Sequence, residues 1–411
     1  MNFKIIGLFT SYLITFLLPS AYSFSETESE PNTNTPLSNF TVTYGGRGFE
    51  AAQDIINVST GGFLVAGRTA SSTGGTDMYL LKLNGQGQLE WEQKIGEDES
   101  DEAAEIIEAE NGTFIIVGNS DSYGGGPGLK DMWAVKVDAQ GNEVWNKTYG
   151  TDTSIDEARG IAPAHDGGYV IIGHTLSLEQ ESSDVMLIKI DSNGEKIWEK
   201  TFGGDKSEEG ADVVQVEDGY TVLGHTESLG KGKWDIWLFH VDKEGNQMWE
   251  KTFGGGDNEM GNALTTLSDG SYVIAGYTYS FAVASLDAWV IKTDQFGEQI
   301  WAKVFGGLST DEAFDVIETK DGNILAAGYT QVYTADQDGN NTSTEGYNVF
   351  LVKIDGSGKE IWQSSLGDNS EQRAFGVVET PDEGIVTVGL TNSEENNGYD
   401  VLVMKVSKSG L

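Results

Sequence analysis

The sequence predicts an all-β fold in which seven four-stranded units close into a ring, and three observations support this. A Gly-x-Thr/Ser signature recurs seven times, 51 to 61 residues apart, with its glycine at Gly67, Gly118, Gly173, Gly224, Gly276, Gly328 and Gly389. A tryptophan follows four residues after another glycine in six units, at Trp91, Trp145, Trp198, Trp249, Trp301 and Trp362. The seventh aromatic stands at the start of the repeat region, where Phe40–Gly46 reads like Trp198–Gly204. Such a period predicts a seven-bladed β-propeller of four-stranded antiparallel blades.

The first two segments of each unit predict a hairpin. The first is acidic and then small, as in Asp156–Ile161, and the second is apolar, as in Tyr169–Gly173. The turn between them is of the Asp-Gly type, which tolerates the positive φ of tight hairpins. These turns are found at Asn111-Gly112, Asp166-Gly167, Asp218-Gly219, Asp269-Gly270 and Asp321-Gly322.

The third and fourth segments complete the blade. The third is apolar on both faces, as in Asp184–Ile190, which is typical of a strand packed between two neighbouring sheets. An Asp-x-x-Gly turn then leads into the tryptophan strand. Because the tryptophan keeps one position in every unit, we expect it to pack between blades and not to stack on sugars. For the basic residues that end the third segment, a structural ion pair with a blade acid is the preferred interpretation over a basic active-site ring. These residues are Lys82, Lys136, Lys189, His240, Lys292, Lys353 and Lys405.

The two ends of the repeat region predict how the ring closes. Gly410 is a seventh turn glycine, and no aromatic follows it before the last residue. We therefore expect residues 40–44 to pair with residues 400–406, so that the N-terminal strand completes the last blade. Closure of this kind removes a free sheet edge that would otherwise invite aggregation.

The first residues have the pattern of a secretory signal. Lys4 precedes an apolar run from Ile5 to Leu18, and Ala21-Tyr22-Ser23 offers a cleavage site with small residues. The run is short for a bilayer span, so we expect residues 1–23 to be a signal peptide and the mature chain to lack a transmembrane span. Residues 24–38 are predicted to be a disordered spacer before the propeller at residues 39–411. We expect a secreted or periplasmic monomer.

The composition excludes several classes of function. The chain has 25 Lys and Arg residues against 65 Asp and Glu residues, and a formal net charge of −40. Such a surface repels nucleic acids and anionic lipids. No cysteine is present, which excludes disulfides and thiolate metal sites. The acidic surplus fits either solubility in a salty exterior or attraction of cations and of a basic partner.

The repeat resembles two groups of proteins. The pattern of Asp-Glu-Ala, Asp-Gly-Gly-Tyr, Gly-x-Thr, Asp-x-Trp and Trp-x-Lys-Thr-Phe-Gly-Gly looks like the tandem repeats of exported bacterial and archaeal β-propeller proteins. The segment Lys136–Trp145 is also similar to the tryptophan-docking motif of quinoprotein propellers, whose dehydrogenases bind pyrroloquinoline quinone with calcium and often carry adjacent cysteines. Because this chain has no cysteine, the second resemblance implies blade packing and not cofactor chemistry.

Acidic residues recur at one register of the first segment, at Glu50, Asp101, Asp156, Glu208, Glu259 and Asp311, with Gln372 in the seventh unit. If these segments are innermost, the six acids form an axial acidic ring at the channel mouth that raises their pKa values or recruits calcium. The alternative, which we weigh more heavily, is that each acid pairs with its own blade's lysine or caps local backbone amides.

Loops between the second and third segments vary in length and lie on the same face as these acids. Binding residues concentrate on variable loops of rigid scaffolds. The candidate binding residues are Tyr123, Trp234, Tyr279, Phe281, Tyr333, Tyr347 and Tyr399. They suit glycan or peptide recognition, or they merely cover the blade tops. In the longest loop, Asp336, Asp338 and Asn340 resemble a calcium loop, but its glycine and closing Glu345 are displaced, so a solvated insertion is the preferred interpretation.

Catalytic motifs are absent from the sequence, since no metalloprotease, serine-hydrolase or phosphate-binding pattern occurs. His174 and His225 occupy matching positions, where the other units hold Arg68, Asn119, Tyr277, Tyr329 and Leu390. We therefore expect a non-enzymatic binding scaffold for a glycan, an envelope polymer or a basic protein, with calcium as a candidate ion. A propeller lyase, a hydrolase or a degenerate quinoprotein that uses the axial acids or the histidines is the alternative. A structural surface protein with no small ligand is the third hypothesis.

Overall fold

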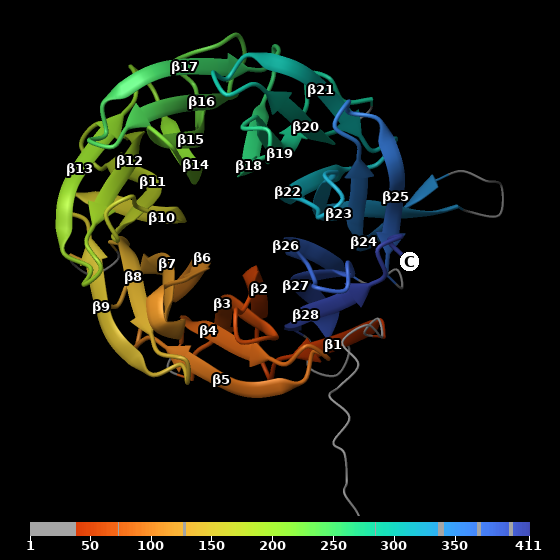
Figure 1. Cartoon of the computed structure of the whole chain (residues 1–411), viewed down its shortest axis with the longest axis horizontal. Helices are drawn as coiled ribbons and strands as arrows, with labels where there is room; N and C mark the ends of the chain where they lie inside the picture. Colours follow the sequence, from red (N-terminus) through yellow and green to blue (C-terminus); the bar gives the residue numbers. More distant parts are fainter. Residues whose placement is uncertain are drawn as a thin grey trace, which may run out of the picture. The chain divides into compact units, whose positions relative to one another are not determined.

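The computed structural model describes residues 38–72, 74–125, 129–283, 285–335, 341–367, 371–393 and 398–411, without the side chains of 333–335, 341–345 and 393. The chain divides into two units, Met1–Thr35 and Pro36–Leu411, and every described residue belongs to the second. This unit consists of seven four-stranded antiparallel sheets that form a ring of blades (Figure 1). The predicted seven-bladed β-propeller is confirmed. The signal peptide and nearly all of the spacer lie outside the described residues and stay predictions.

Consecutive strands run from the centre of the ring to its rim in six of the blades (Figure 1). Blade 1 contains β2 (Glu50–Asn57), β3 (Phe63–Ala70), β4 (Thr76–Leu83) and β5 (Leu89–Ile95). Blade 2 contains β6 (Asp101–Glu108), β7 (Phe114–Ser120), β8 (Asp131–Val137) and β9 (Glu143–Tyr149). Blade 3 contains β10 (Ser154–Pro163), β11 (Tyr169–Ser177), β12 (Ser182–Ile190) and β13 (Lys196–Phe202). Blade 4 contains β14 (Glu208–Val216), β15 (Gly219–Thr226), β16 (Asp235–Asp242) and β17 (Gln247–Phe253).

Blade 5 contains β18 (Glu259–Thr266), β19 (Tyr272–Thr278), β20 (Asp287–Thr293) and β21 (Gln299–Phe305). Blade 6 contains β22 (Asp311–Glu318), β23 (Ile324–Ala335), β24 (Asn341–Ile354) and β25 (Glu360–Leu366). Blade 7 contains β26 (Gln372–Glu379), β27 (Ile385–Ser393) and β28 (Gly398–Val406), with β1 (Phe40–Tyr44) as its outer strand. Among the described residues the one helical element is the short 3₁₀ turn η1 (Glu110–Gly112), and no helix there is long and apolar enough to cross a bilayer.

The ring closes as predicted. Strand β1 pairs antiparallel with β28, from Phe40 opposite Lys405 to Tyr44 opposite Val401. The last blade is therefore built from both ends of the repeat region, and its third strand β28 is paired on both sides like the third strand of every other blade. The segment that comes first in the repeat region thus acts structurally as its last strand.

The repeated tryptophans pack between blades, as predicted. Each lies against the turn glycine of the following blade, which has positive φ in the Asp-x-x-Gly turn. A Cβ on Gly297, for example, would lie only 2.6 Å from the Trp249 ring. The seventh contact is made by Phe40 against Gly87, where a Cβ would lie 2.4 Å from the ring. The same contact between an aromatic ring and a turn glycine therefore occurs at all seven interfaces between blades, including the one between blades 7 and 1.

A β-bulge interrupts the first strand of every blade and explains the Gly-x-Thr/Ser signature. In blade 3 the register shifts between Ala158 and Gly160, which leaves Arg159 as the extra residue. The bulge aims the Glu157 carbonyl at Gly173 on the second strand, where a Cβ would lie 1.8 Å from that oxygen. Only glycine fits so close an approach. The corresponding extra residues are Gln53, Ala104, Arg159, Ala211, Asn262, Phe314 and Phe375.

The basic residues that end the third strands form structural ion pairs, as predicted. Lys189 lies 2.7 Å from Asp166 and Lys353 lies 2.8 Å from Asp321, each acid belonging to the first hairpin turn of the same blade. Lys292 and Lys405 make the same contact with Asp269 and Asp382, and His240 lies 3.4 Å from Asp218, although burial lowers the pKa of its ring. Blade 2 differs, because Asn111 stands in its turn and Lys136 donates to the Ser192 carbonyl instead.

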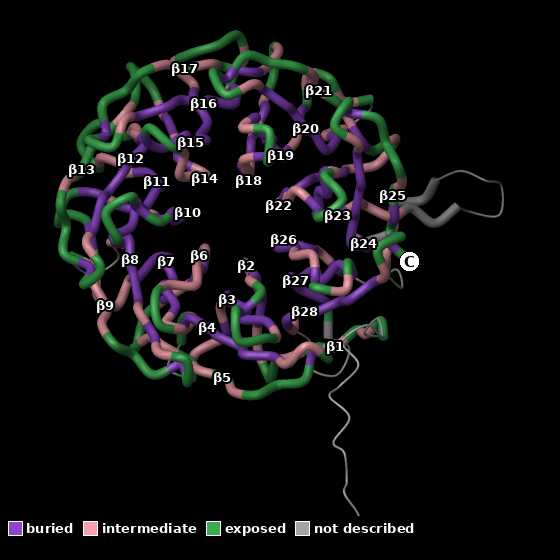
Figure 2. Tube along the Cα trace, viewed as in Figure 1, coloured by how far each residue is buried: buried purple, intermediate pink, exposed green. Residues whose placement is uncertain are grey.

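The hydrophobic core lies between the blades. The third strands are almost completely buried, whereas the outer strands are largely exposed on one face (Figure 2). Each pair of adjacent blades encloses one cluster of buried side chains. The cluster that joins blade 7 to blade 1 includes Leu81, Val388 and Val403, so the closing interface is packed like the others.

Candidate functional site

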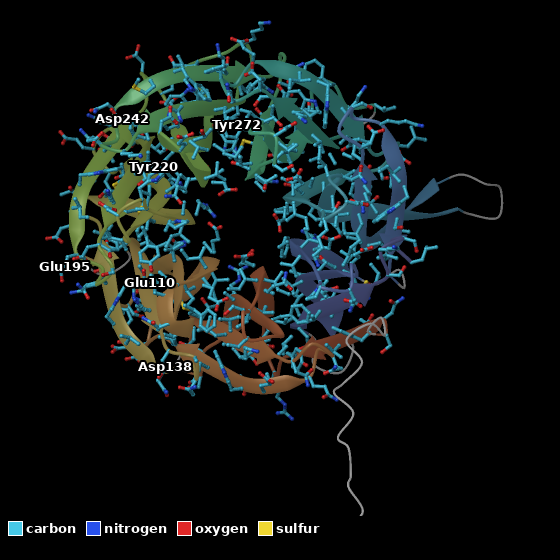
Figure 3. All side chains as sticks on the ribbon, viewed as in Figure 1. Glu110, Asp138, Glu195, Tyr220, Asp242 and Tyr272 are labelled. Carbon is cyan, nitrogen blue, oxygen red and sulfur yellow. The ribbon has the colours of Figure 1, made fainter. Side chains whose placement is uncertain are left out.

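The two faces of the ring differ in how their polar groups are used. The hairpin turns form one face, hereafter the turn face, and Asp138, Glu195 and Asp242 mark its outer edge (Figure 3). Asp138 accepts hydrogen bonds from the backbone N–H groups of Gln140 and Asn142, and the Asn142 side chain also donates to it. The side-chain hydrogen bond from Asn142, aided by these backbone bonds, lowers the pKa of Asp138. Such turn acids serve the local fold. The opposite face carries the loops between second and third strands and is called the loop face.

The six predicted axial acids lie near the loop face, but the structure does not bring them together. All of them are buried, each at most 3% exposed. Glu259 accepts hydrogen bonds from the backbone N–H groups of Gly255 and Ser280 and from the Thr278 hydroxyl. Glu208 makes the same set of contacts in blade 4 with Gly204, Ser228 and Thr226. These contacts agree with the alternative interpretation, in which each acid caps local backbone amides.

Four other acids on innermost strands interact with one another electrostatically, and sequence reasoning missed them. Asp54, Glu105, Asp212 and Asp315 follow the bulge residue in blades 1, 2, 4 and 6, and we call them the carboxylate belt. Each accepts a backbone N–H of the next blade, at Ile106, Ile161, Leu264 and Val377 respectively. The available signal was a second acid four residues after the first in these four units.

Burial is the main reason why the pKa values of the carboxylate belt are raised. It raises the pKa of Asp54 to about 7, with a further contribution from the charge of Asp315. Burial likewise raises the pKa of Asp212 to about 7 and that of Asp315 to about 6. Burial together with Asp212 and Asp54 raises the pKa of Glu105. These carboxylates therefore act on one another, and the ionisation of one raises the pKa of the others.

A cavity of about 360 Å³ occupies the axial region, and side chains from all seven blades line it. We call it the axial cavity. Every bulge places its extra residue toward the axis, and all seven of these residues belong to the lining. Blades 6 and 7 contribute Phe314 and Phe375, whose ring centroids lie 5.0 Å apart at an interplanar angle of 75°. Blade 4 contributes the small Ala211 with Glu209, and blade 3 contributes Arg159. The cavity is therefore apolar on one side and charged on the other.

Of the matching positions that include His174 and His225, those of Asn119 and His225 line the cavity. His225 lines the cavity and donates its Nε2 hydrogen to the Gly261 carbonyl, with N and O 2.7 Å apart. His174 lies 3.8 Å from Glu157, between their Nε2 and Oε2 atoms. Burial lowers the pKa of both histidines, so they are neutral at physiological pH. Among the described residues no group of three or more His, Cys, Asp or Glu side chains is arranged to hold a metal ion.

Two of the predicted binding aromatics contact residues of one ion pair at the start of blade 7. Tyr399 donates to Glu371, and Glu371 forms an ion pair with Arg373 at 2.5 Å. The Arg373 guanidinium in turn lies over the Tyr347 ring, 4.2 Å from its centroid. The structure therefore brings Tyr347 and Tyr399 together through an arginine and a glutamate of blade 7, which sequence reasoning did not single out.

The other predicted aromatics are spread over the loop face. Tyr123 stacks on Trp133, and Trp234 meets His225 edge-on, at centroid distances of 5.4 Å and 6.5 Å. Tyr279 and Phe281 are 44% and 49% exposed, so they are the available aromatic surface. The Tyr333 side chain and the candidate calcium loop with Asp336, Asp338 and Asn340 lie outside what the structure describes. Their roles stay predictions.

Comparison with known sequences finds partial matches. No protein-family profile matches the chain. A stretch of 221 residues, 47% of this chain, is 26% identical to the regulatory protein FlaEY of Caulobacter vibrioides. A stretch of 226 residues is 23% identical to an uncharacterized WD repeat-containing protein of Acanthamoeba polyphaga mimivirus. The matched parts cover 23% and 15% of those proteins, so the chain spans only a small share of these relatives.

Comparison with solved structures supports the fold alone. The WD40 domain of Neurospora crassa Pan2 aligns with 86% of this chain and 88% of its own, with a TM-score of 0.53 and 10% identity. BBS1N, crystallised in complex with ARL6DN, aligns over 90% of this chain and 96% of its own, with a TM-score of 0.50 and 9% identity. These similarities show a β-propeller fold and do not by themselves indicate a function.

Proposed function

We propose that this protein is a non-enzymatic, extracytoplasmic binding scaffold whose loop face recognises a basic protein partner. The observation that carries the proposal is the difference between the two faces. On the turn face, lysines, acids, tryptophans and glycines are engaged in contacts that hold the blades together. On the loop face, Tyr279 and Phe281 remain about half exposed beside a surplus of carboxylates. Aromatic anchors within a charged rim are the usual composition of a protein-binding surface.

Charge favours a basic partner over an acidic one. The net charge of −40 attracts a cationic surface over long distances and raises its rate of association at low salt. The fold itself is compatible with a protein ligand, since BBS1N, which has a similar fold, was crystallised with ARL6DN. The apolar run at Ile5–Leu18 supports export and hence a partner outside the cytoplasm. An enzymatic role has less support, because the two histidines are buried and neutral and Nε2 of His225 is already bonded to a backbone carbonyl.

Quantitative binding with matched variants tests the proposal. A partner is captured by cross-linking, identified, purified and titrated by calorimetry at two salt concentrations. We expect Phe281→Ser to weaken its binding about ten-fold or more and higher salt to weaken it further. Phe296→Ser is the control, because Phe296 is 60% exposed but lies in a hairpin turn on the opposite face.

Two results would overturn the proposal. One is an equal loss of affinity in Phe281→Ser and Phe296→Ser, since the loop face would then have no special role. The other is the absence of a protein ligand together with specific binding on a glycan array that depends on Trp234 and Tyr279, which would assign the loop face to a saccharide. Turnover of a polymer that is lost in His174→Ala with His225→Ala would instead favour an enzyme.

A further inference from the structure

We propose that the axial cavity binds a single organic cation, an ammonium or guanidinium group of the kind that ends a lysine or arginine side chain. The inference rests on the proposed function, because a basic partner on the loop face would supply this group. It adds a defined site at the centre of the ring, separate from Tyr279 and Phe281. Charge, an unpartnered acceptor and the shape of the cavity support it independently.

Glu209 provides the charge. It lines the axial cavity, and among the described residues no protein group donates a hydrogen bond to it or forms an ion pair with it. The other acids at this register are engaged. Glu102 lies 2.7 Å from Arg68, and Glu157 lies 2.9 Å from Arg159. Glu312 accepts the Tyr329 hydroxyl at 2.5 Å. Glu209 is therefore the carboxylate at this register that remains available to an incoming cation.

His225 provides an acceptor without a partner. Its ring is 6% exposed, lines the cavity and is neutral because of burial. Since Nε2 carries the hydrogen that is donated to Gly261, Nδ1 of the neutral ring holds a lone pair, and that atom has no hydrogen-bond partner. Nδ1 of His174, in the adjacent blade, is also without a partner. The unshared lone pair at Nδ1 of His225 adds negative potential to this wall of the cavity, which favours a cationic ligand.

The aromatic wall of the cavity completes the site. Phe314 and Phe375 are bulge residues on the side of the ring opposite Ala104 and Ala211, whose small side chains leave the space open. The face of an aromatic ring attracts ammonium and guanidinium groups. A cavity of about 360 Å³ has the size of a small-molecule pocket and accommodates such a head group with an alkyl stem.

The surroundings disfavour an anion. Arg159 is the one basic side chain in the lining apart from histidine, and it forms an ion pair with Glu157, which Lys130 also contacts at 3.4 Å. The carboxylate belt adds negative charge along the axis as it ionises, which attracts a cation and repels an anion. A neutral ligand of the same shape would gain the contacts with the rings but not the electrostatic attraction. The sign of the charge is therefore the discriminating property of the ligand.

Calorimetric titration of the full chain with agmatine tests the site without any partner, and N-butylurea serves as a neutral analogue of similar shape. We expect agmatine to bind with a stoichiometry of one and N-butylurea to bind about ten-fold more weakly or not at all. Glu209→Gln should weaken agmatine binding about ten-fold. Glu217→Gln, which removes an exposed acid from a hairpin turn on the opposite face, should leave it unchanged. Ala211→Leu fills the cavity without altering charge and should abolish binding, and unfolding curves show whether each variant folds.

The outcomes separate this inference from the function on which it rests. Equal binding of agmatine and N-butylurea, or unchanged binding in both Glu209→Gln and Ala211→Leu, would overturn the cation site. Absence of agmatine binding, with partner binding that still depends on Phe281, would refute the site and leave the scaffold proposal standing. Agmatine binding with no protein partner on the loop face would support the site and refute that proposal.

Discussion

At the scale of single residues, each Gly-x-Thr/Ser signature combines two structural requirements around one variable position. The glycine accommodates the carbonyl that the bulge directs at it, as at Gly173 and Glu157. In blades 1, 2, 4 and 5 the hydroxyl donates to the acid that begins the first strand, as Thr278 donates to Glu259. The middle residue is free to differ, and in blades 3 and 4 it is His174 or His225 at the mouth of the channel. Variation within a repeated signature therefore identifies the site more directly than the repeat itself does.

Loss of one first-strand acid should destabilise the propeller. Glu259 is buried and accepts three hydrogen bonds, so Glu259→Gln leaves buried donors without an equivalent acceptor. We expect a loss of about 1–3 kcal/mol in the free energy of unfolding, measured by denaturant titration. Glu298→Gln is the control, because its ion pair with Lys251 is solvent-exposed and should be worth about 1 kcal/mol or less. Equal losses in the two variants would contradict the structural role assigned to Glu259.

At the scale of elements, two contacts join neighbouring blades at different radii. Near the rim, each aromatic of a fourth strand packs on the turn glycine of the next blade, as Trp249 packs on Gly297. Near the axis, four of the seven junctions carry a carboxylate that accepts a backbone N–H of the next first strand, as Asp212 does from Leu264. The rim contact is apolar and repeated, whereas the axial contact is charged and occurs in selected blades. Of these two contacts, only the axial one contains a titratable group, so only that contact makes the stability of the ring depend on pH.

Alanine in place of the turn glycine Gly297 should destabilise the protein, whereas alanine in place of Gly307 should not. Gly297 has a φ of 77°, and an added Cβ would meet the Trp249 ring at 2.6 Å. We expect Gly297→Ala to lower stability by more than about 1 kcal/mol, because strain and a displaced tryptophan add together. An added Cβ on Gly307 would meet nothing within 4 Å, so Gly307→Ala should change stability little. Thermal unfolding of both variants checks the contrast, and a stable Gly297→Ala protein would refute the packing argument.

Stability should fall as pH rises through the neutral range because of the carboxylate belt. Its pKa values are raised to about 7 for Asp54 and Asp212, so between about pH 4 and 7 the folded state binds protons that the unfolded state has released. The stabilisation is complete below about pH 4 and is lost as pH rises through about 7. We expect the double variant Asp54→Asn with Asp212→Asn to show a smaller change in Tm between pH 5 and pH 8 than the parent chain. The exposed pair Asp98→Asn with Asp205→Asn is the control, and an unchanged slope in the belt variant would contradict the assignment.

At the scale of the whole molecule, closure by β1 makes the ring depend on contacts between distant parts of the chain. Strand β1 pairs with β28, and its Phe40 packs on Gly87 of blade 1. One short strand therefore supplies backbone hydrogen bonds within blade 7 and apolar contacts at the interface between blades 7 and 1. Without it, β28 would present a free edge.

Removal of the closing strand should open the seventh blade. We compare a chain that begins at Ser38 with one that begins at Arg47, which lacks β1. The shorter chain should unfold at a lower temperature and aggregate, as measured by thermal unfolding and light scattering, because the β28 edge and the cluster around Val403 lose their cover. Equal stability and solubility of the two chains would refute closure as a requirement for folding.

The sequence by itself determined the number of blades, the order of their strands and the exchange of the terminal strand. These features depend on local requirements that recur in the chain: positive φ at Gly297, apolar alternation in Asp184–Ile190 and an aromatic at Phe40 in the position of the tryptophans. It also predicted the lysine ion pairs, since both partners belong to one repeat.

Only the tertiary structure decided which side chains share the axis. Glu209 and Phe375 come from different blades, and the bulged first strands bring them to one cavity. The signature could not distinguish Glu208, which is buried in its own blade, from the adjacent Glu209, which lines the cavity. Neighbouring residues of a strand point to opposite sides, and the side that becomes the channel exists only once the ring has closed.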